Sequence, residues 1–319
     1  MCIRDRLMHI GAGNVVALSV LSVLEGLLAG NINILKLPSY EGGISLRLLK
    51  ELVAIEPRLK PYIYVLDISS RDMKTIEILS KVADAAIVWG SDEAISGIRQ
   101  MAPPSLPIIE WGHRLSFAYL TLGHDLDAQL KGLAEEICLS NQQYCSSPQS
   151  VFVETHDRDQ LEEVARKLLK AIENLSVKYP QGNVSVSERG EITWTRSIAK
   201  MEAVLGKQKV LESDDLEVSI LVDYRPHLKA SPMYRNIWMM PIERKDILSV
   251  LRPYKGYLQT VGLECKREEL MELAGIFYKA GVNRVTDCGH MSRTYIGEPH
   301  DGKPTLREYT RRVSLRCYD

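Results

Sequence analysis

The sequence predicts an α/β protein in which a doubly wound parallel sheet is followed by a second α/β domain. In the first third of the chain, strand-like and helix-like stretches alternate, as right-handed βαβ crossovers require. The strand-like stretches are short and apolar on both faces, as at residues 32–37 and 85–89, which is typical of strands covered by helices on both faces. The 319 residues are also enough for two domains.

The elements of the first domain follow from these apolar periods. We predict, in order, a helix at 15–29, a strand at 32–37, a helix at 44–55, a strand at 62–68, a helix at 73–82, a strand at 85–89, a helix at 93–101 and a strand at 106–110. The boundary is expected at 112/113, which gives domains 7–112 and 113–314.

Beyond residue 113 the pattern of the chain changes. We predict a helix at 126–139, a strand at 149–154, a helix at 158–175, a polar Gly/Ser stretch around 181–190, strands at 217–222, 237–241 and 256–261, and a helix at 267–280. This order indicates a second α/β domain.

Composition narrows the possible functions. The net charge is 40 − 41 = −1, so the chain has no excess of positive charge to attract nucleic acid or an acidic membrane surface. The six cysteines form no CxxC pair and no metal-like cluster with the seven histidines, so we expect a reduced, cytoplasmic setting and no metal site. Nucleic-acid partners are not expected.

An uncharged segment at residues 7–24 follows Arg4 and Arg6 and has some features of a signal peptide or a short membrane anchor. Gly11 and Gly13 interrupt its apolar run, and the chain continues as helix and then strand. A buried helix of an α/β domain explains the pattern better, so we predict no membrane span.

Candidate nucleotide-binding residues lie where predicted strands end, because helix N-termini and backbone N–H groups meet phosphate there. Lys36 ends one strand, and Gly90 and Ser91 follow another and open a helix. A solvated lysine and a plain N-cap serine are the alternatives. The run from His9 to Asn14 contains Gly11 and Gly13, but a dinucleotide-binding turn needs a strand before it, which residues 1–8 do not predict.

Two further residues are candidates for covalent or acid–base chemistry. Cys145 lies in a polar loop between a helix and a strand, where a thiol is accessible and N–H donors can stabilise a thiolate. Cys138, on the apolar side of its helix, is typical of a buried core thiol. Glu110 ends an apolar strand, where burial can adapt a carboxylate to act as a base or proton relay. An ordinary strand-end glutamate is the alternative.

Taken together, these residues resemble the aldehyde dehydrogenase superfamily. The run from Asn14 to Ser39, the Gly90-Ser91 turn, the Glu110-Trp111-Gly112-His113 run and Cys145 match its motifs in order and spacing. Within it, residues 142–149, 257–262 and 299–302 resemble the LuxC-type acyl-CoA reductases, and the resemblance covers about residues 8–314.

The resemblance implies an activity, a cofactor and residue roles. It implies NADPH-dependent reduction of a long-chain fatty acyl thioester to a fatty aldehyde through an acyl-enzyme on Cys145, as in aldehyde supply for bacterial luminescence. It implies an oxyanion-binding amide at Asn14, or Gly13 in its place, and a proton relay at Glu110. Lys36, Ser39, Gly90 and Ser91 are expected at the cofactor, and NADPH is favoured because Ser39 stands where NAD-preferring members often have a glutamate.

The resemblance also leaves alternatives open. An oxidative aldehyde dehydrogenase, a semialdehyde or acyl-phosphate reductase, and a non-catalytic subunit that assembles with a partner are the other functions considered. The expected partners are long-chain acyl-CoA or an acylated protein, an acyl-protein synthetase subunit, and further copies of the full-length chain. The family has a long segment before the point where the resemblance begins, so we expect an N-terminally truncated fragment with a partial NAD(P)-binding domain.

Overall fold

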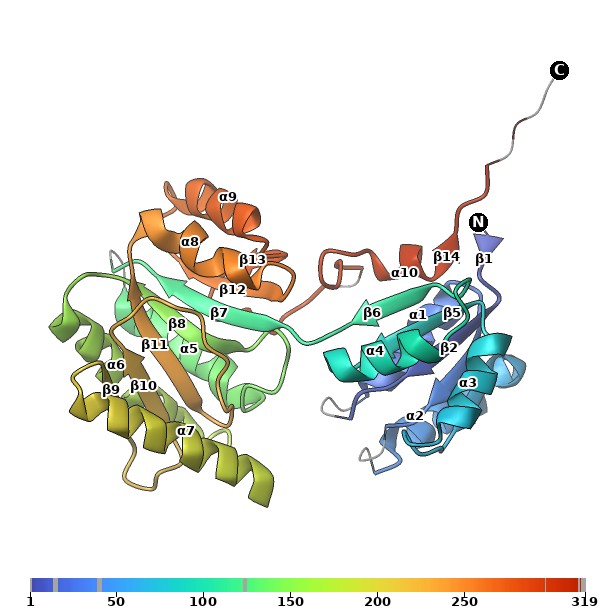
Figure 1. The fold of residues 1–319 in the computed structure, drawn as a ribbon, viewed down its shortest axis with the longest axis horizontal. Helices are drawn as coiled ribbons and strands as arrows, with labels where there is room; N and C mark the ends of the chain where they lie inside the picture. Colours follow the sequence, from blue (N-terminus) through green and yellow to red (C-terminus); the bar gives the residue numbers. More distant parts are fainter. Residues whose placement is uncertain are drawn as a thin grey trace. The chain divides into compact units, whose positions relative to one another are not determined.

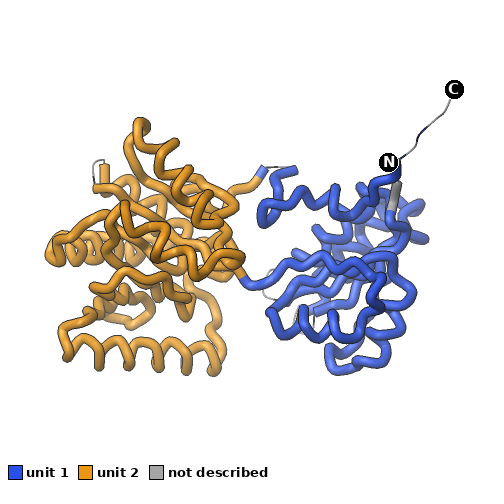
Figure 2. The backbone as a smooth tube through the Cα atoms, turned by 45° about the horizontal axis from the view of Figure 1, so that its top comes forward, with its two compact units in different colours: residues 1–113, 295–319 blue, residues 114–294 orange. Residues whose placement is uncertain are grey.

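The computed structural model describes residues 2–13, 17–38, 42–122, 125–295, 297–314 and 316, and it divides the chain into two compact units (Figures 1 and 2). The first unit contains Met1–His113 and Tyr295–Asp319, and the second contains Arg114–Thr294. The division falls at 113/114, beside the expected boundary at 112/113. Residues 295–314 differ from the expectation, because they belong to the first unit and not to the second.

The first unit contains a five-stranded parallel sheet with helices on both faces and a separate two-stranded antiparallel sheet. Its strands are β1 (Cys2–Ile3), β2 (Arg6–Ile10), β3 (Ile32–Lys36), β4 (Ile63–Leu66), β5 (Ala85–Trp89), β6 (Ile108–Trp111) and β14 (Thr310–Arg311). Its helices are α1 (Leu18–Leu28), α2 (Ile44–Ile55), the 3-10 helix η1 (Pro57–Tyr62), α3 (Met73–Val82), α4 (Asp92–Met101) and α10 (Thr305–Glu308).

The order of the five-stranded sheet is β4-β3-β2-β5-β6, and every neighbouring pair is parallel. The chain winds outward from β2 through β3 to β4 on one side, and through β5 to β6 on the other. The order therefore reverses at β2, and ligands of doubly wound sheets bind at the carboxyl ends of the strands next to such a switch point.

The central strand β2 corrects the sequence analysis, which did not predict a strand before Gly11. Leu7 and Met8 are fully buried, and so is His9. The His9 ring lies 2.8 Å from the Ser22 hydroxyl through Nδ1 and 2.9 Å from Asn33 Oδ1 through Nε2. A polar side chain is stable in a central strand when both of its ring nitrogens are bonded in this way, but a hydropathy pattern does not reveal such bonds.

Residues 295–314 join the first unit through specific contacts. β14 pairs antiparallel with β1. Tyr309 is fully buried, its carbonyl accepts from the Asn31 amide at 3.1 Å, and its hydroxyl lies 3.2 Å from the Ser22 hydroxyl. The His300 ring packs edge-on against Trp89 and Trp111, with ring centroids 5.1 and 5.0 Å away.

The second unit is built on a seven-stranded sheet. Its strands are β7 (Leu115–Leu120), β8 (Pro148–Glu154), β9 (Gln208–Glu212), β10 (Ser219–Asp223), β11 (Asn236–Ile242), β12 (Leu258–Glu264) and β13 (Arg284–Thr286). Its helices are α5 (Leu126–Leu139), α6 (Arg158–Ser176), α7 (Val186–Val204), α8 (Ile247–Leu251) and α9 (Leu270–Ala280), with 3-10 helices η2 (Arg244–Asp246) and η3 (Arg252–Tyr254).

The strand order of this sheet is β13-β12-β7-β8-β11-β10-β9, parallel except for the edge strand β9. Apolar side chains of α5 and α6 form the core on one face of the sheet. Side chains of α8 and α9 form the core on the other face, together with Ala199 of α7.

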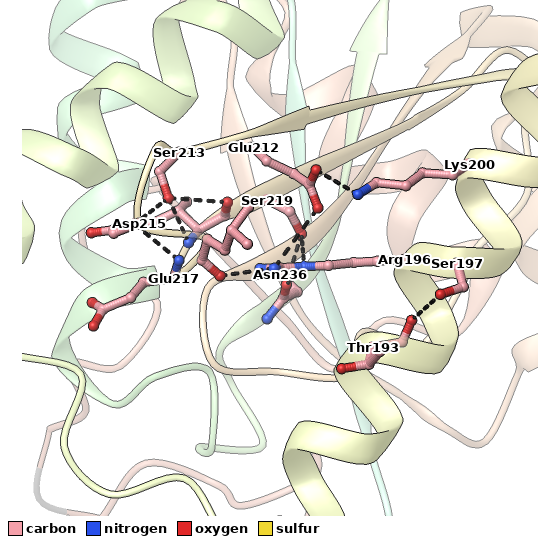
Figure 3. Close-up of polar contacts among 12 residues, drawn as sticks. Thr193, Arg196, Ser197, Lys200, Glu212, Ser213, Asp215, Glu217, Ser219 and Asn236 are labelled. Carbon is pink, nitrogen blue, oxygen red and sulfur yellow. Dashed lines mark hydrogen bonds and ion pairs between the residues drawn. The ribbon is translucent and has the colours of Figure 1, made fainter.

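Helix α7 begins inside the stretch predicted to be a polar loop. Ser185 and Glu188 form a capping box at its start. Further along, the buried Arg196 donates through Nε to the Asn236 side chain at 2.8 Å and through Nη1 to the Leu216 carbonyl at 2.8 Å (Figure 3). These bonds attach the helix to β11 and to the turn before β10. The largely polar sequence of the helix has no apolar period from which it could be predicted. Among the described residues, no helix combines the length and the apolar character that crossing a bilayer requires.

Candidate active site

Cys145 lies in the loop that joins α5 to β8, close to the amino end of β8. Its side chain is exposed, whereas Cys138 and Cys288 are buried and Cys265 is half-buried. Burial raises the pKa of the Cys138 thiol to about 11 and also raises the pKa of Cys265 and Cys288. Because the thiolate is the nucleophile, these three thiols are poorly suited to react. Cys145 is the accessible thiol among the cysteine side chains that the structure describes.

The loop around Cys145 is held on both sides. The side chain of Gln142 is fully buried, and its amide donates to the Pro148 carbonyl at 2.9 Å. The hydroxyls of Ser140 and Ser147 lie 2.9 Å apart across the loop. These bonds fix the chain before and after the cysteine, so the exposed thiol is carried by an ordered turn.

Sequence reasoning missed Tyr234, which lies beside this loop. Its hydroxyl accepts a hydrogen bond from the Gln143 amide and donates to Glu188 at 2.5 Å. Burial and the nearby Glu188 carboxylate raise the pKa of Tyr234 to about 12, so the hydroxyl stays protonated at neutral pH. Tyr234 belongs to a turn in which three consecutive non-glycine residues, Met233 to Arg235, have positive φ. Such a turn has no sequence signature, because it lacks the glycine that usually marks positive φ.

In the first unit, Lys36 ends β3 and is 2% exposed. Its Nζ donates to the Ser70 hydroxyl at 2.6 Å. Burial lowers the pKa of Lys36, and the Asp67 carboxylate acts in the opposite direction. The interpretation of Lys36 as a solvated strand-end lysine is therefore wrong, because the side chain is buried at the carboxyl end of β3 and bonded to Ser70.

The turn after β2 is too tight for a side chain at Gly11. A Cβ on Gly11 would lie 2.3 Å from the Ser19 hydroxyl, so only glycine fits there. The Ser19 hydroxyl is itself buried and has no hydrogen-bond partner within the described part of the chain. A close approach of backbone and an unsatisfied donor are what a dinucleotide phosphate uses at a switch point. The residues present therefore fit the phosphates of a dinucleotide.

Gly90 and Ser91 follow β5 and open α4. The Gly90 N–H donates to the Trp111 carbonyl at 3.2 Å, and the Ser91 hydroxyl accepts from the Ala94 N–H at 3.4 Å. Ser91 is thus an N-cap, the alternative considered above. Because α4 begins just after β5 ends, its N-terminus lies at the carboxyl edge of the sheet, next to the switch point at β2.

Glu110 lies in β6, and its carboxylate is about one quarter exposed. It accepts from the Arg99 guanidinium of α4, with which it forms an ion pair. A catalytic role for this carboxylate stays a prediction.

The structure brings Lys36, Gly90, Ser91 and Glu110 to the carboxyl ends of β3, β5 and β6 in one sheet. Cys145 belongs to the other unit. Asn14 and Ser39 lie outside the described residues.

Comparison with known families decides what kind of protein this is. The model of the acyl-CoA reductase (LuxC) family matches residues 4–312. The chain belongs to the LuxC family. The resemblance to LuxC-type acyl-CoA reductases, drawn from residues 142–149, 257–262 and 299–302, is confirmed.

Curated relatives of this LuxC-family chain include the "Long-chain acyl-protein thioester reductase" of Aliivibrio fischeri, which is 26% identical over 310 residues. The protein of the same name from Vibrio harveyi is 25% identical over 317 residues. The matches cover 96% and 98% of this chain but 63% and 64% of the relatives. The chain thus spans somewhat less than two thirds of the length of these proteins.

Solved structures similar to this LuxC-family chain are aldehyde dehydrogenases. A betaine aldehyde dehydrogenase from Staphylococcus aureus in complex with NAD+ aligns with a TM-score of 0.75 at 15% identity, covering 96% of this chain and 67% of that one. A benzaldehyde dehydrogenase from Corynebacterium glutamicum aligns with a TM-score of 0.73 at 15% identity, covering 97% and 68%. The predicted aldehyde dehydrogenase-like fold is therefore confirmed.

Proposed function

We propose that this chain carries the machinery for NADPH-dependent reduction of a long-chain fatty acyl thioester to a fatty aldehyde, with Cys145 as the nucleophile. The observation that carries the proposal is the exposed Cys145 thiol on an ordered turn, in a LuxC-family chain whose other described thiols have raised pKa. Aldehyde supply for luminescence is the physiological role that this activity would serve.

In the first half of the reaction, the Cys145 thiolate attacks the carbonyl carbon of the acyl thioester. A bond forms between Sγ and that carbon, the bond to the leaving thiol breaks, and the leaving thiolate takes up a proton. The product is an acyl group bound as a thioester to Cys145. In the second half, reduction of this thioester gives a hemithioacetal, which collapses to release the aldehyde and regenerate the Cys145 thiolate.

When bound, the reduced dinucleotide supplies the hydride for the second half. The residues that would hold it lie at the carboxyl edge of the first sheet: Gly11 and the buried Ser19 hydroxyl at the turn, the Lys36 ammonium, and the N-terminus of α4 at Gly90 and Ser91. We assign NADPH in preference to NADH because Ser39 and Lys36 present no carboxylate that would repel a 2′-phosphate.

Two residues complete the proposed chemistry. Asn14, or Gly13 in its place, would donate to the oxyanion that forms at each addition. Glu110, which forms an ion pair with Arg99, would relay a proton as the thiol leaves or returns.

The acyl donor is proposed from the names of the relatives, which are acyl-protein thioester reductases. An acylated protein, formed by a synthetase subunit, is therefore a donor of this chain in addition to acyl-CoA. We also propose that the protein acts as a homo-oligomer.

The test is to incubate the protein with tetradecanoyl-CoA and NADPH and to measure tetradecanal by gas chromatography. We expect aldehyde from the wild type and from Cys265→Ser, and none from Cys145→Ser. Faster turnover of tetradecanal with NAD than of tetradecanoyl-CoA with NADPH would contradict the proposal and favour an oxidative dehydrogenase. Nucleotide binding without any reaction at Cys145 would favour a non-catalytic assembly subunit.

A further inference from the structure

Ser116 lies directly beneath the Cys145 loop. It is the second residue of β7 and is fully buried. Its hydroxyl oxygen accepts from the Thr260 N–H of β12 at 3.1 Å and donates to the Cys145 carbonyl at 2.6 Å. The direction of both bonds is settled, since an N–H can only donate and a carbonyl oxygen can only accept.

The sheet is irregular at this point. The pairing of β7 with β8 shifts register between Ser116 and Phe117, where Ser116 stands opposite Pro148. The pairing of β12 with β7 shifts between Leu258 and Val261. Irregularities of this kind leave ladder groups unpaired and redirect side chains. The Ser116 hydroxyl bonds to the Thr260 N–H, which lies where the β12 register shifts, and to the Cys145 carbonyl in the loop before β8.

This bond fixes the peptide that follows the nucleophile. In a trans peptide the carbonyl and the next N–H point in opposite directions. Because the Cys145 carbonyl points to the fully buried Ser116 hydroxyl, the Ser146 N–H of the same peptide points away from that hydroxyl. A backbone N–H fixed beside a thiol stabilises negative charge there, first on the thiolate and then on the oxyanion of the bound acyl group.

We propose that Ser116 is a positioning residue for the Cys145 nucleophile, which sets the Cys145–Ser146 peptide so that its N–H serves the reacting thiol. The inference rests on the proposed role of Cys145. It extends that role by naming a buried serine in β7 of the second unit, and it assigns Ser116 no contact with the substrate.

The test measures the rate at which iodoacetamide alkylates Cys145 over a range of pH, with mass spectrometry of the peptide that contains it. Removing the hydroxyl in Ser116→Ala should raise the pH midpoint of alkylation by about one unit and slow the reaction at neutral pH about tenfold. Ser116→Thr, which keeps the hydroxyl, should restore the wild-type midpoint.

Ser150→Ala is the matched control. Ser150 is also fully buried, and its hydroxyl donates to the Lys229 carbonyl at 2.8 Å and accepts from the Lys229 N–H at 3.3 Å. We expect both alanine variants to lose thermal stability but only Ser116→Ala to shift the alkylation midpoint. Equal midpoints in the two variants would overturn the proposal.

If Ser116→Ala does not fold, Ser116→Cys replaces it, because a thiol of similar volume is a much weaker donor. A wild-type midpoint in that variant, or failure of both variants to fold, would reduce Ser116 to a structural residue and overturn the proposal. Alkylation needs neither acyl donor nor nicotinamide. A shifted midpoint without aldehyde production would therefore contradict the proposed function while supporting the positioning role.

Discussion

The hydroxyl of Tyr309 lies 3.2 Å from the hydroxyl of Ser22, although the two residues are 287 positions apart in the chain. Ser22 also contacts His9 Nδ1 at 2.8 Å and accepts from the Trp89 indole at 3.2 Å. One buried serine thus joins β2, α1, β5 and the segment after α10. The network holds the strand that leads into the proposed phosphate turn at Gly11.

This network predicts the effect of removing one hydroxyl. Tyr309→Phe should lower the free energy of unfolding by about 1 kcal/mol, since it deletes one buried hydrogen bond and leaves the ring in place. The change is measured by urea unfolding. Tyr278→Phe in α9, where the side chain is 58% exposed, is the control and should change stability by less than about 0.5 kcal/mol. Equal effects in the two variants would show that the contact adds nothing.

The same network predicts a dependence on pH. Burial lowers the pKa of His9 to about 4, whereas the unfolded chain takes up the proton near pH 6.5. The contribution of neutral His9 to stability is therefore complete above pH 6.5 and is lost as the pH falls toward 4. Between pH 6.5 and pH 5 the loss is about 2 kcal/mol, at about 1.4 kcal/mol per unit.

Glu25 in α1 acts in the opposite direction. Burial raises its pKa to about 7, so its contribution is complete below its unfolded pKa of 4.5 and is lost as the pH rises through 7. We predict that Glu25→Gln steepens the loss of stability between pH 7 and pH 5, because it removes the group that offsets His9. Urea unfolding at both pH values measures this, and a slope identical to that of the wild type would show that Glu25 is not coupled to folding.

Part of the fold was predictable from the sequence, and the exceptions have physical causes. Apolar periods predicted β3, β5, α2 and α5 to within a residue or two, because burial on one or both faces dictates their pattern. β2 was missed because the fully buried His9 interrupts its apolar pattern and charged residues precede it. α7 was missed because a single buried arginine, Arg196, attaches a largely polar helix to the sheet.

The candidate site was likewise only partly predictable from the sequence. Cys145 and Lys36 were recognisable by residue type and place in a motif, and the structure agrees that one is exposed and the other is held at a strand end. Ser116 and Tyr234 were not recognisable. Their importance comes from hydrogen bonds across 29 and 91 positions of the chain, which no local pattern encodes.

The proposed role of Lys36 at the cofactor predicts that its substitution weakens NADPH binding. Lys36→Met should weaken NADPH binding about tenfold or more, because the ammonium that would meet the ribose or phosphate is removed. Titration of NADPH fluorescence measures the Kd. Lys50→Met, which alters an exposed lysine of α2, is the control and should bind as the wild type does. Unchanged binding in Lys36→Met would remove Lys36 from the proposed cofactor site.

The proposed proton relay at Glu110 predicts that its substitution slows aldehyde formation but not acyl transfer to Cys145. Glu110→Gln should slow steady-state aldehyde formation about tenfold by removing a proton relay, while acyl transfer to Cys145 stays close to the wild-type rate. Rapid-quench measurement of both steps checks this. A Glu110→Gln variant that turns over as fast as the wild type would leave Glu110 with only its ion pair to Arg99.

The most direct test of the account is the mass of the chain after brief exposure to tetradecanoyl-CoA without any nicotinamide cofactor. We predict a tetradecanoyl adduct on the peptide that contains Cys145, absent from Cys145→Ser and present in Cys265→Ser. An adduct confined to another residue, or no adduct in a folded protein, would contradict the proposal that Cys145 is the nucleophile.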